Sequence, residues 1–331
     1  MVSGDVLLHP TLLEQAQSAA KNGNGKDYDF SALLAGLKPY VQDADAALCN
    51  FETPIGTPPY SGYPRFTVPA QILSDLKSIG YDGCTTATNH TVDAGTSGVT
   101  RTLDAFEEQR LFATGSYRTE QESHQPPIMQ VDGVKLGVIA STFSLNGLPE
   151  ATDWQVDTGV DAQKLIQRAK AARKDGAEIV VAAIHDGTEY STRPTTQQRK
   201  LGRELAASGV FDFIYMHHTH SVLPIEKYDG TWIVYGLGNS VAKHATKTIL
   251  NREGISVKAT FSHKGKAQDW AVSKLQWVPH QLSSSPVTWC QVFETSSCLP
   301  AADAAASLAR TQATVNAYGA DNDGLAEWKL E

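Results

Sequence analysis

The stretch FDFIYMHHTH, residues 211–220, begins as an apolar run and ends in a cluster of imidazoles. The run is rich in aromatic and β-branched residues and is short enough for a buried strand. α/β proteins usually place ligand-binding residues where such strands end. In an extended tip, His218 and His220 would point one way, and His217 and Thr219 the other. We therefore expect a pair of metal ligands here, with a solvated polar turn as the alternative.

Length, composition and charge restrict the class of protein. The 331 residues suffice for one large α/β domain or two small ones. A hydrophobic share of 41% and a charged share of 19% are typical of a globular protein with a sizeable core. The net charge of −8 argues against nucleic acid or an anionic membrane as the main partner. Because no run of about 18 apolar residues occurs, the sequence predicts no membrane-spanning helix.

The cysteines and the start of the chain bear on its location. None of the four cysteines has CxxC spacing, which disfavours a zinc knuckle or a thioredoxin-like motif. Cys290 and Cys298 flank a short Ser-rich loop, where we expect a local disulfide and an oxidising compartment. Cys49 and Cys84 end apolar runs and are interpreted as buried thiols, or as a pair if their strands are neighbours. The chain starts almost at a strand end, so we expect an extracytoplasmic protein with an export signal or membrane anchor in a preceding segment.

Strands alternate with helices in the first two thirds of the chain, and hairpins follow. Helical patterns cover residues 30–40 and 92–109, whereas residues 178–184, EIVVAAI, form a very apolar strand pattern. This order predicts an α/β protein, a mixed sheet system with helices outside. The segment 283–286 is the best candidate boundary, so we expect a main domain over residues 1–280. The tail, residues 281–331, would hold the local disulfide and a peripheral Ala-rich helix.

Polar residues recur directly after the apolar runs. If these strands are parallel, their carboxyl ends bring the side chains together at one edge. A mixed set of carboxylate, amide and imidazole groups suits Zn, Mn, Fe or a pair of these ions better than Ca or a thiolate site. Taken singly, Asp5 also suits a turn, Glu52 an exposed position, and Asn89 and Asp93 helix caps. The candidate residues are Asp5, Asn50, Glu52, Asn89, His90, His185, His218 and His220.

Several motifs in a fixed order resemble those of the CapA family. The motifs are Gly4-Asp5, NFETP at 50–54, YPRF at 63–66, TNHTVDAG at 88–95, HDGTEY at 185–190, HHTH at 217–220 and YGLGN at 235–239. They cover about residues 3–245. CapA is the poly-γ-glutamate capsule synthesis protein, and its family is related to calcineurin-like metallophosphoesterases. The resemblance implies a four-layer α/β/β/α sandwich of metallophosphoesterase type, with the site at the strand ends.

The resemblance also implies roles for the polar residues. Those implied for metal binding are Asp5 and His220 at a first ion, Asn89, His185 and His218 at a second, and Glu52 as the bridging carboxylate. His90 would contact the leaving group as general acid. Two positions depart from the superfamily pattern, because Leu7 stands where Asp-x-His has its histidine and Glu52 replaces an aspartate. His9 is a possible substitute for the missing histidine, and the number of ions stays open at one or two.

Three further residues are candidates for binding the substrate. Arg65 would hold an anionic group through its guanidinium, and an ordinary surface arginine is the alternative. Asn239 would shape the site, as would Glu189 and Tyr190. His9 is the third candidate, because it lies on the loop that follows Asp5.

The sequence thus predicts a metal-dependent hydrolase of the CapA family, linked to poly-γ-glutamate capsule synthesis or processing at the cell surface. One or two divalent ions would activate water, and an anionic polymer or a phosphoester would be the substrate. The alternative is a non-catalytic polymer-binding or assembly component with a structural metal. Membrane proteins of capsule synthesis are possible partners, and no nucleic acid is expected. A serine hydrolase is disfavoured because no GxSxG motif occurs.

Overall fold

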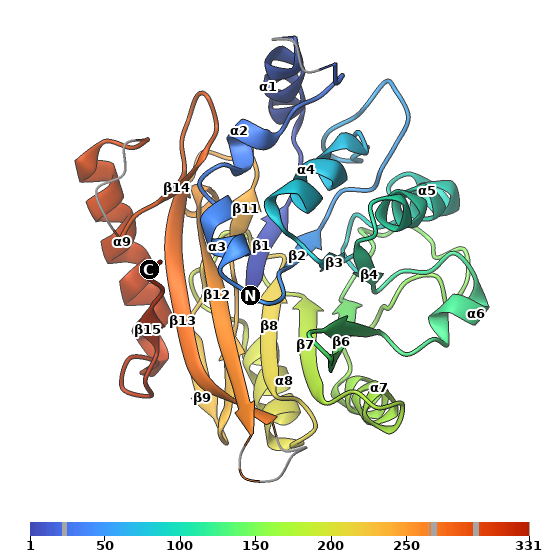
Figure 1. Ribbon diagram of the computed structural model, residues 1–331, viewed down its shortest axis with the longest axis vertical. Helices are drawn as coiled ribbons and strands as arrows, with labels where there is room; N and C mark the ends of the chain where they lie inside the picture. Colours follow the sequence, from blue (N-terminus) through green and yellow to red (C-terminus); the bar gives the residue numbers. More distant parts are fainter. Residues whose placement is uncertain (22–24, 264, 266–269, 294–297, 331) are drawn as a thin grey trace.

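Two β-sheets lie face to face at the centre of the protein, and helices cover their outer sides (Figure 1). The computed structural model describes residues 1–21, 25–263, 265, 270–293 and 298–330. No helix in these ranges is both long and apolar enough to cross a membrane.

The first sheet has the strand order β14-β13-β12-β1-β2-β3-β4, with β11 beside β1 and β15 beside β13. Its strands are β1 (Val2–Val6), β2 (Leu48–Phe51), β3 (Gly83–Thr85), β4 (Phe112–Thr114), β11 (Asn239–Val241), β12 (Glu253–His263), β13 (Trp270–Leu282), β14 (Trp289–Gln291) and β15 (Ala326–Glu327). β1, β2, β3 and β4 run parallel, as does the β1–β11 pair, whereas β12, β13 and β14 pair in antiparallel fashion. The carboxyl ends of β1, β2 and β3 therefore meet at one edge.

The second sheet has the order β5-β6-β7-β8-β10-β9. Its strands are β5 (Ile128–Val131), β6 (Val134–Thr142), β7 (Ile179–His185), β8 (Phe213–His217), β9 (Ile225–Tyr228) and β10 (Thr231–Val234). The central strands β6, β7, β8 and β10 are parallel. β7 is apolar throughout because both of its faces are buried, with Val181 and Ala183 toward the other sheet and Val180 and Ala182 toward the helices.

Helices complete the outer layers. They are α1 (Pro10–Ala20), α2 (Ser31–Leu34), α3 (Lys38–Gln42), α4 (Gln71–Ile79), α5 (Gly95–Glu108), α6 (Glu120–Ser123), α7 (Ala162–Lys174), α8 (Thr196–Ala207) and α9 (Ala301–Val315), with short 3-10 helices η1 (Leu250–Arg252) and η2 (Asn316–Tyr318). One apolar cluster joins α1–α5 to the first sheet, another joins α7 and α8 to the second, and a third fills the space between the sheets. The described part of the chain is thus a four-layer α/β/β/α sandwich, which confirms the predicted fold class.

The residues after position 280 add to the first sheet. β14 and β15 both pair with β13, and α9 packs against β12 and β13 (Figure 1). The expected disulfide between Cys290 and Cys298 is present. β13 runs to Leu282, two residues past the expected limit of the main domain at residue 280, and ends directly before the candidate boundary segment 283–286. The division into a main domain and a tail stays a prediction.

The prediction of one helix over residues 30–40 was wrong. This segment forms two short helices, α2 and α3. They are separated around Gly36, where an added Cβ atom would lie 2.1 Å from the carbonyl oxygen of Trp289, so the chain passes directly against β14.

The alternatives left open for Cys49 and Cys84 are resolved. The two residues are register partners on β2 and β3 and form a disulfide rather than two buried thiols.

Candidate metal centre

The polar residues that follow the strands converge where the two sheets end. Asp5 is paired in register with Asn50 on one side and with Asn239 on the other. On the facing sheet, His185 and His217 are register partners at the ends of β7 and β8. These side chains are all at most 2% exposed, so the site is built inside the protein and not on a surface loop.

Asp5 is the carboxylate with most contacts in this cluster. Its Oδ1 accepts a hydrogen bond from Asn50 Nδ2 at 2.9 Å and lies 3.0 Å from His217 Nδ1. Its Oδ2 lies 3.2 Å from His220 Nδ1. Burial alone would raise the pKa of Asp5, but hydrogen bonds with His217 and His220 outweigh burial and hold that pKa well below its usual range. Asp5 is therefore an ionised carboxylate within the site.

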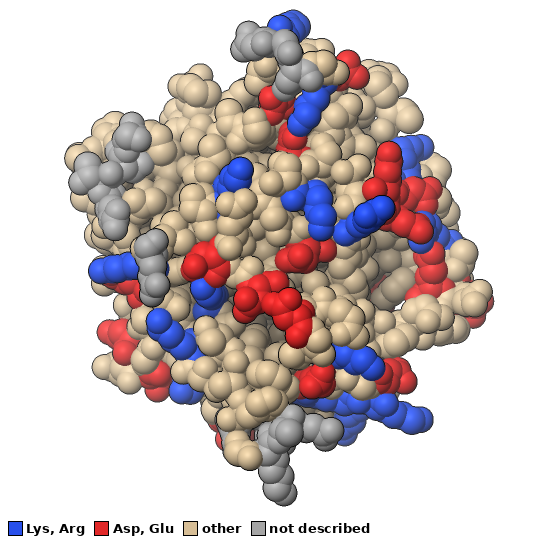
Figure 2. Space-filling view, viewed as in Figure 1, with Lys and Arg blue, Asp and Glu red and all other residues tan. Residues whose placement is uncertain are grey.

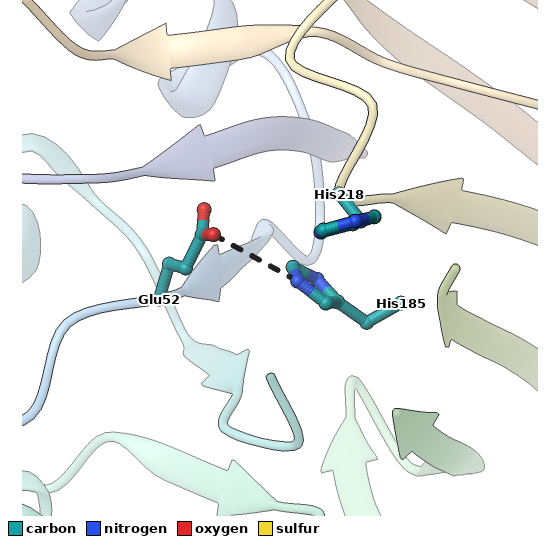
Figure 3. A group of neighbouring side chains, drawn as sticks. All are labelled: Glu52, His185 and His218. Carbon is teal, nitrogen blue, oxygen red and sulfur yellow. Dashed lines mark ion pairs between the residues drawn. The ribbon is translucent and has the colours of Figure 1, made fainter. Parts of the chain in front are cut away.

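Glu52, directly after β2, differs from Asp5 in its hydrogen bonding and in the direction of its pKa shift. Both of its carboxylate oxygens are buried without a hydrogen-bond partner among the described residues. Oε1 lies 3.8 Å from His185 Nε2 and 3.6 Å from His220 Nε2. Figure 3 shows the carboxylate directed toward His185, with the ring of His218 beside it. Burial raises the pKa of Glu52 well above its usual range, because its charged form is not solvated there.

The donor set fits a divalent cation. Glu52, His185 and His218 bring ligand atoms within 4.8 Å of one another, as do Asp5, Glu52 and His220, and also Glu189, His218 and His220. Burial lowers the pKa of His185 well below its usual range and that of His218 to about 3, so both rings are neutral and have a lone pair to offer. A cation would supply the missing partners of Glu52, whose unpaired burial is otherwise costly.

Asn89 and His90 lie on the loop between β3 and α5. Asn89 Oδ1 accepts from His185 Nε2 at 2.9 Å, which places the amide beside the Glu52 and His185 pair. His90 Nδ1 lies 2.7 Å from Asp93 Oδ2, so the carboxylate orients the ring. The second ring nitrogen, Nε2, is not engaged by Asp93. Asp93 was interpreted as a helix cap, but it holds His90 and the backbone N–H of Phe66, and Ala94 precedes α5 instead.

The extended tip expected at the end of β8 is not formed. The strand ends at His217, and His218 and His220 have φ angles of +85° and +49°, in the left-handed region. The alternation of side chains therefore stops at His217, whose ring faces Asp5 although the sequence argument had pointed it away. His217 is a site residue that the sequence analysis did not predict. Its position directly after the apolar run was the feature that could have indicated its role.

Asn239 fixes the orientation of His220 and joins it to a second missed residue, His244. Asn239 Oδ1 accepts from His220 Nδ1 at 2.9 Å, which leaves His220 Nε2 facing Glu52. The amide nitrogen of Asn239 donates to Asn251 O and lies 3.2 Å from His244 Nε2. His244 Nδ1 lies 3.2 Å from the hydroxyl of Tyr190. This chain of hydrogen bonds extends from the metal centre to the surrounding loops.

His9 and Arg65 are the candidate substrate-binding residues on the segments before α1 and α4. His9 Nδ1 accepts the backbone N–H of Lys243 at 3.1 Å, and its ring packs against Phe66 and His244. His9 is outside the groups of clustered ligand atoms found among the described residues. Arg65 is exposed and directly precedes Phe66, whose ring contacts His90. His9 thus borders the site through the ring of His244, whereas Arg65 as a substrate-binding residue stays a prediction.

Comparison with known proteins identifies the family. A sequence profile described as "Bacterial capsule synthesis protein PGA_cap" matches residues 1–244. The chain belongs to this family. The resemblance to CapA stated from the motifs is thereby confirmed.

Two curated relatives are members from Bacillus. The chain is 30% identical over 213 residues to the PGA biosynthesis protein CapA of Bacillus subtilis strain 168, covering 62% of this chain and 55% of that protein. It is 27% identical over 230 residues to the capsule biosynthesis protein CapA of Bacillus anthracis, covering 66% of this chain and 55% of that protein. The chain thus spans little more than half the length of these relatives.

A solved structure supports the fold. A 5'-nucleotidase precursor from Thermus thermophilus aligns with a TM-score of 0.50 at 13% identity, over 85% of this chain and 52% of that chain. At this identity the likeness concerns the fold alone. It agrees with the α/β/β/α arrangement derived from the strand order and the apolar clusters.

Binding of a cation is expected to release a proton at neutral pH. Burial alone would lower the pKa of His220, but the negative charges of Glu52 and Asp5 outweigh burial and raise that pKa to about 9. His220 is therefore protonated at neutral pH, whereas a metal ligand must be unprotonated. For one displaced proton, metal affinity should rise about tenfold per pH unit below that pKa. Calorimetry in buffers of different ionisation enthalpy measures this release, and its absence at neutral pH would contradict the prediction.

Proposed function

We propose that this protein of the PGA_cap family is a metal-dependent hydrolase linked to poly-γ-glutamate capsule synthesis or processing at the cell surface. The observation that carries the proposal is Glu52, a fully buried carboxylate with neither oxygen hydrogen-bonded among the described residues, between His185 and His220. Such an arrangement is costly without a cation and favourable with one.

The residues that would hold one or two divalent ions are Asp5, Glu52, Asn89, His185, His218 and His220. A divalent ion of Mn, Zn or Fe type would lower the pKa of a water molecule and polarise a phosphoryl or acyl oxygen. Asn50 would keep Asp5 and His185 in place, because its amide nitrogen lies within hydrogen-bonding distance of both. Asn239 would do the same for His220.

His90 would serve as the general acid. Asp93 holds Nδ1, so the proton for a leaving group would be carried on Nε2. Phe66 packs edge-on against the ring at a centroid distance of 4.9 Å and restricts its rotation. Arg65, exposed and next to Phe66 in sequence, would bind an anionic group of the substrate through its guanidinium.

The substrate class is proposed from the family. The relatives are named for PGA biosynthesis and capsule biosynthesis, which supports an anionic γ-glutamyl polymer, with a phosphoester as the other substrate class. The two disulfides support an oxidising, extracytoplasmic location. Membrane proteins of capsule synthesis are the proposed partners.

Replacing His185 with Ala tests the catalytic proposal. We expect purified wild-type protein to contain a transition metal and to hydrolyse p-nitrophenyl phosphate, a phosphodiester or a γ-glutamyl polymer. His185→Ala should lose the metal and lower the rate by about a hundredfold or more. His124→Ala removes an exposed histidine near α6 and should change neither quantity. Full activity of His185→Ala, or activity in metal-free wild type, would contradict the proposal.

A non-catalytic role is the second candidate. A relative from Mycobacterium tuberculosis, 25% identical over 169 residues, is named a probable polyglutamine synthesis accessory protein, which favours a role in handling polymer. In this case the metal would be structural. Polymer binding that persists in His185→Ala, in a wild type without turnover, would favour this candidate over the hydrolase.

A further inference from the structure

A basic loop adjoins the metal centre. No Asp or Glu occurs from residue 230 to residue 252, although the chain has a net charge of −8. Within the last ten residues of that segment lie Lys243, Lys247 and Arg252. Among the described residues, no carboxylate lies within ion-pair distance of these three side chains. The arginines with carboxylate partners are Arg118, Arg168, Arg173, Arg199, Arg203 and Arg310.

Unpaired lysines also occur elsewhere, because Lys170 and Lys174 on α7 have no ion pair among the described residues either. On the face shown in Figure 2, Lys and Arg side chains lie among Asp and Glu side chains rather than in one continuous basic patch. Pairing of this kind neutralises most of the local field, whereas an unpaired group of cations retains it. The loop therefore attracts an anion, and its shape must supply the selectivity over other unpaired lysines.

The basic loop encloses a pocket of about 410 Å³ that is lined by residues 243–249, Asn251 and Arg252. The cationic side chains that line the pocket donate hydrogen bonds to backbone carbonyls and not to carboxylates. Lys243 Nζ donates to Ser284 O at 2.8 Å, and Arg252 donates from Nε and Nη2 to Leu282 O at 3.0 and 2.8 Å. Asn251 Nδ2 donates to Thr246 O across the loop. Neutral carbonyl partners fix the positions of the cations without cancelling them.

His244 connects this pocket to the metal centre. Its ring lines the pocket and packs on His220 at a centroid distance of 4.6 Å. Its Nε2 faces Asn239, which holds His220, and its Nδ1 faces the Tyr190 hydroxyl. The pocket is thus one imidazole ring away from a residue expected to bind metal.

We propose that the pocket lined by Lys243, Lys247 and Arg252 binds an anionic group, a carboxylate or a phosphate, of a substrate whose reacting bond lies at the metal centre. This inference rests on the proposed function, because it deepens the substrate class of the same site. It requires a substrate with a second anionic group beyond the reacting one, which a polymer of γ-glutamyl units has and a simple phosphomonoester lacks. The pocket would select for the longer substrate.

The test measures binding without depending on turnover. A fluorescently labelled γ-glutamyl oligomer is titrated against wild type and against Lys243→Ala/Lys247→Ala, with inorganic phosphate as competitor. The control is Lys170→Ala/Lys174→Ala on α7, which removes the same charge at the same spacing from exposed positions. We expect the pocket variant to bind about tenfold more weakly, with a smaller dependence on salt, and the control to bind as wild type does.

Several results would overturn the inference. These are no binding of the oligomer by wild type, unchanged binding by the pocket variant, or an equal loss in both double variants. Lys247→Glu is a second variant in case the first does not fold, since Lys247 is exposed and has no hydrogen bond among the described residues. It should weaken binding at least as much as the double variant. The same titration in His185→Ala separates the two proposals, because loss of turnover with intact, lysine-dependent binding contradicts the hydrolase alone.

Discussion

Replacing Glu52 with Gln is expected to stabilise the metal-free protein and to abolish its stabilisation by divalent cations. Both oxygens of Glu52 are buried without hydrogen-bond partners among the described residues, so folding must take up a proton or bury a charge that His220, 3.6 Å from Oε1, offsets only in part. Gln has nearly the same shape without the charge, and the gain should be about 1–3 kcal/mol in the free energy of unfolding. It should also weaken metal binding by about a hundredfold or more, because an amide replaces a carboxylate ligand. Thermal unfolding in chelator and in excess Mn or Zn measures both effects.

The gain from Glu52→Gln should depend on pH in a definite direction. The pKa of Glu52 is raised in the folded state, so its contribution to stability is full below the unfolded pKa and is lost as pH rises toward the folded one. The advantage of Gln over Glu should therefore increase from mildly acidic to alkaline pH. Glu226 is the matched control, a buried glutamate whose oxygens accept from Arg199, Arg203 and Tyr235. Glu226→Gln should lower the free energy of unfolding. A lower free energy of unfolding in metal-free Glu52→Gln would contradict the prediction.

Removing the Cys49–Cys84 disulfide should be the most damaging change to the first sheet. The two residues are 35 apart in sequence, and closing a loop of this length contributes about 3–4 kcal/mol to the free energy of unfolding. The bond joins β2 and β3, whose ends lead to Glu52 and Asn89, so metal affinity should fall as well. Urea unfolding of Cys49→Ala/Cys84→Ala and a metal titration measure these losses.

The second disulfide supplies the comparison. Cys290 and Cys298 are only 8 apart, and their bond joins β14 to the segment before α9, neither of which supplies a residue of the metal centre. Cys290→Ala/Cys298→Ala should cost less stability and leave metal affinity as in wild type. An equal or greater loss of stability in this variant would show that the loop-closure argument does not apply here.

The fold was predictable because the sequence patterns and the packing agree. EIVVAAI is apolar at almost every position, and β7 indeed has helices on one face and the other sheet on the other. The order of the polar residues along the chain was equally informative. Parallel strands of one sheet must end at the same edge, so Asp5 and Glu52 could be placed together without coordinates. His185 ends β7 of the facing sheet, so its place beside them was implied by the family resemblance and not by strand direction alone.

The features that the sequence did not predict depend mostly on contacts between distant segments. The pairing of Cys49 with Cys84 required the register of β2 against β3, which neither strand determines alone. The orientations of His218 and His220 required left-handed backbone at both residues, for which the sequence has no glycine as a signal. His244 follows no apolar run, and it reaches the site only because Asn239 and Tyr190 hold its two nitrogens.

The position of β11 beside β1 has a consequence for synthesis of the chain. Asp5 belongs to the first strand, yet its register partner Asn239 and its neighbour His220 are translated near the end of the family segment. A nascent chain on the ribosome therefore contains the early carboxylates without the imidazoles that complete the site. Closing such a long loop is slow, so cation uptake should be a late event that follows synthesis of the segment from His220 to Asn239.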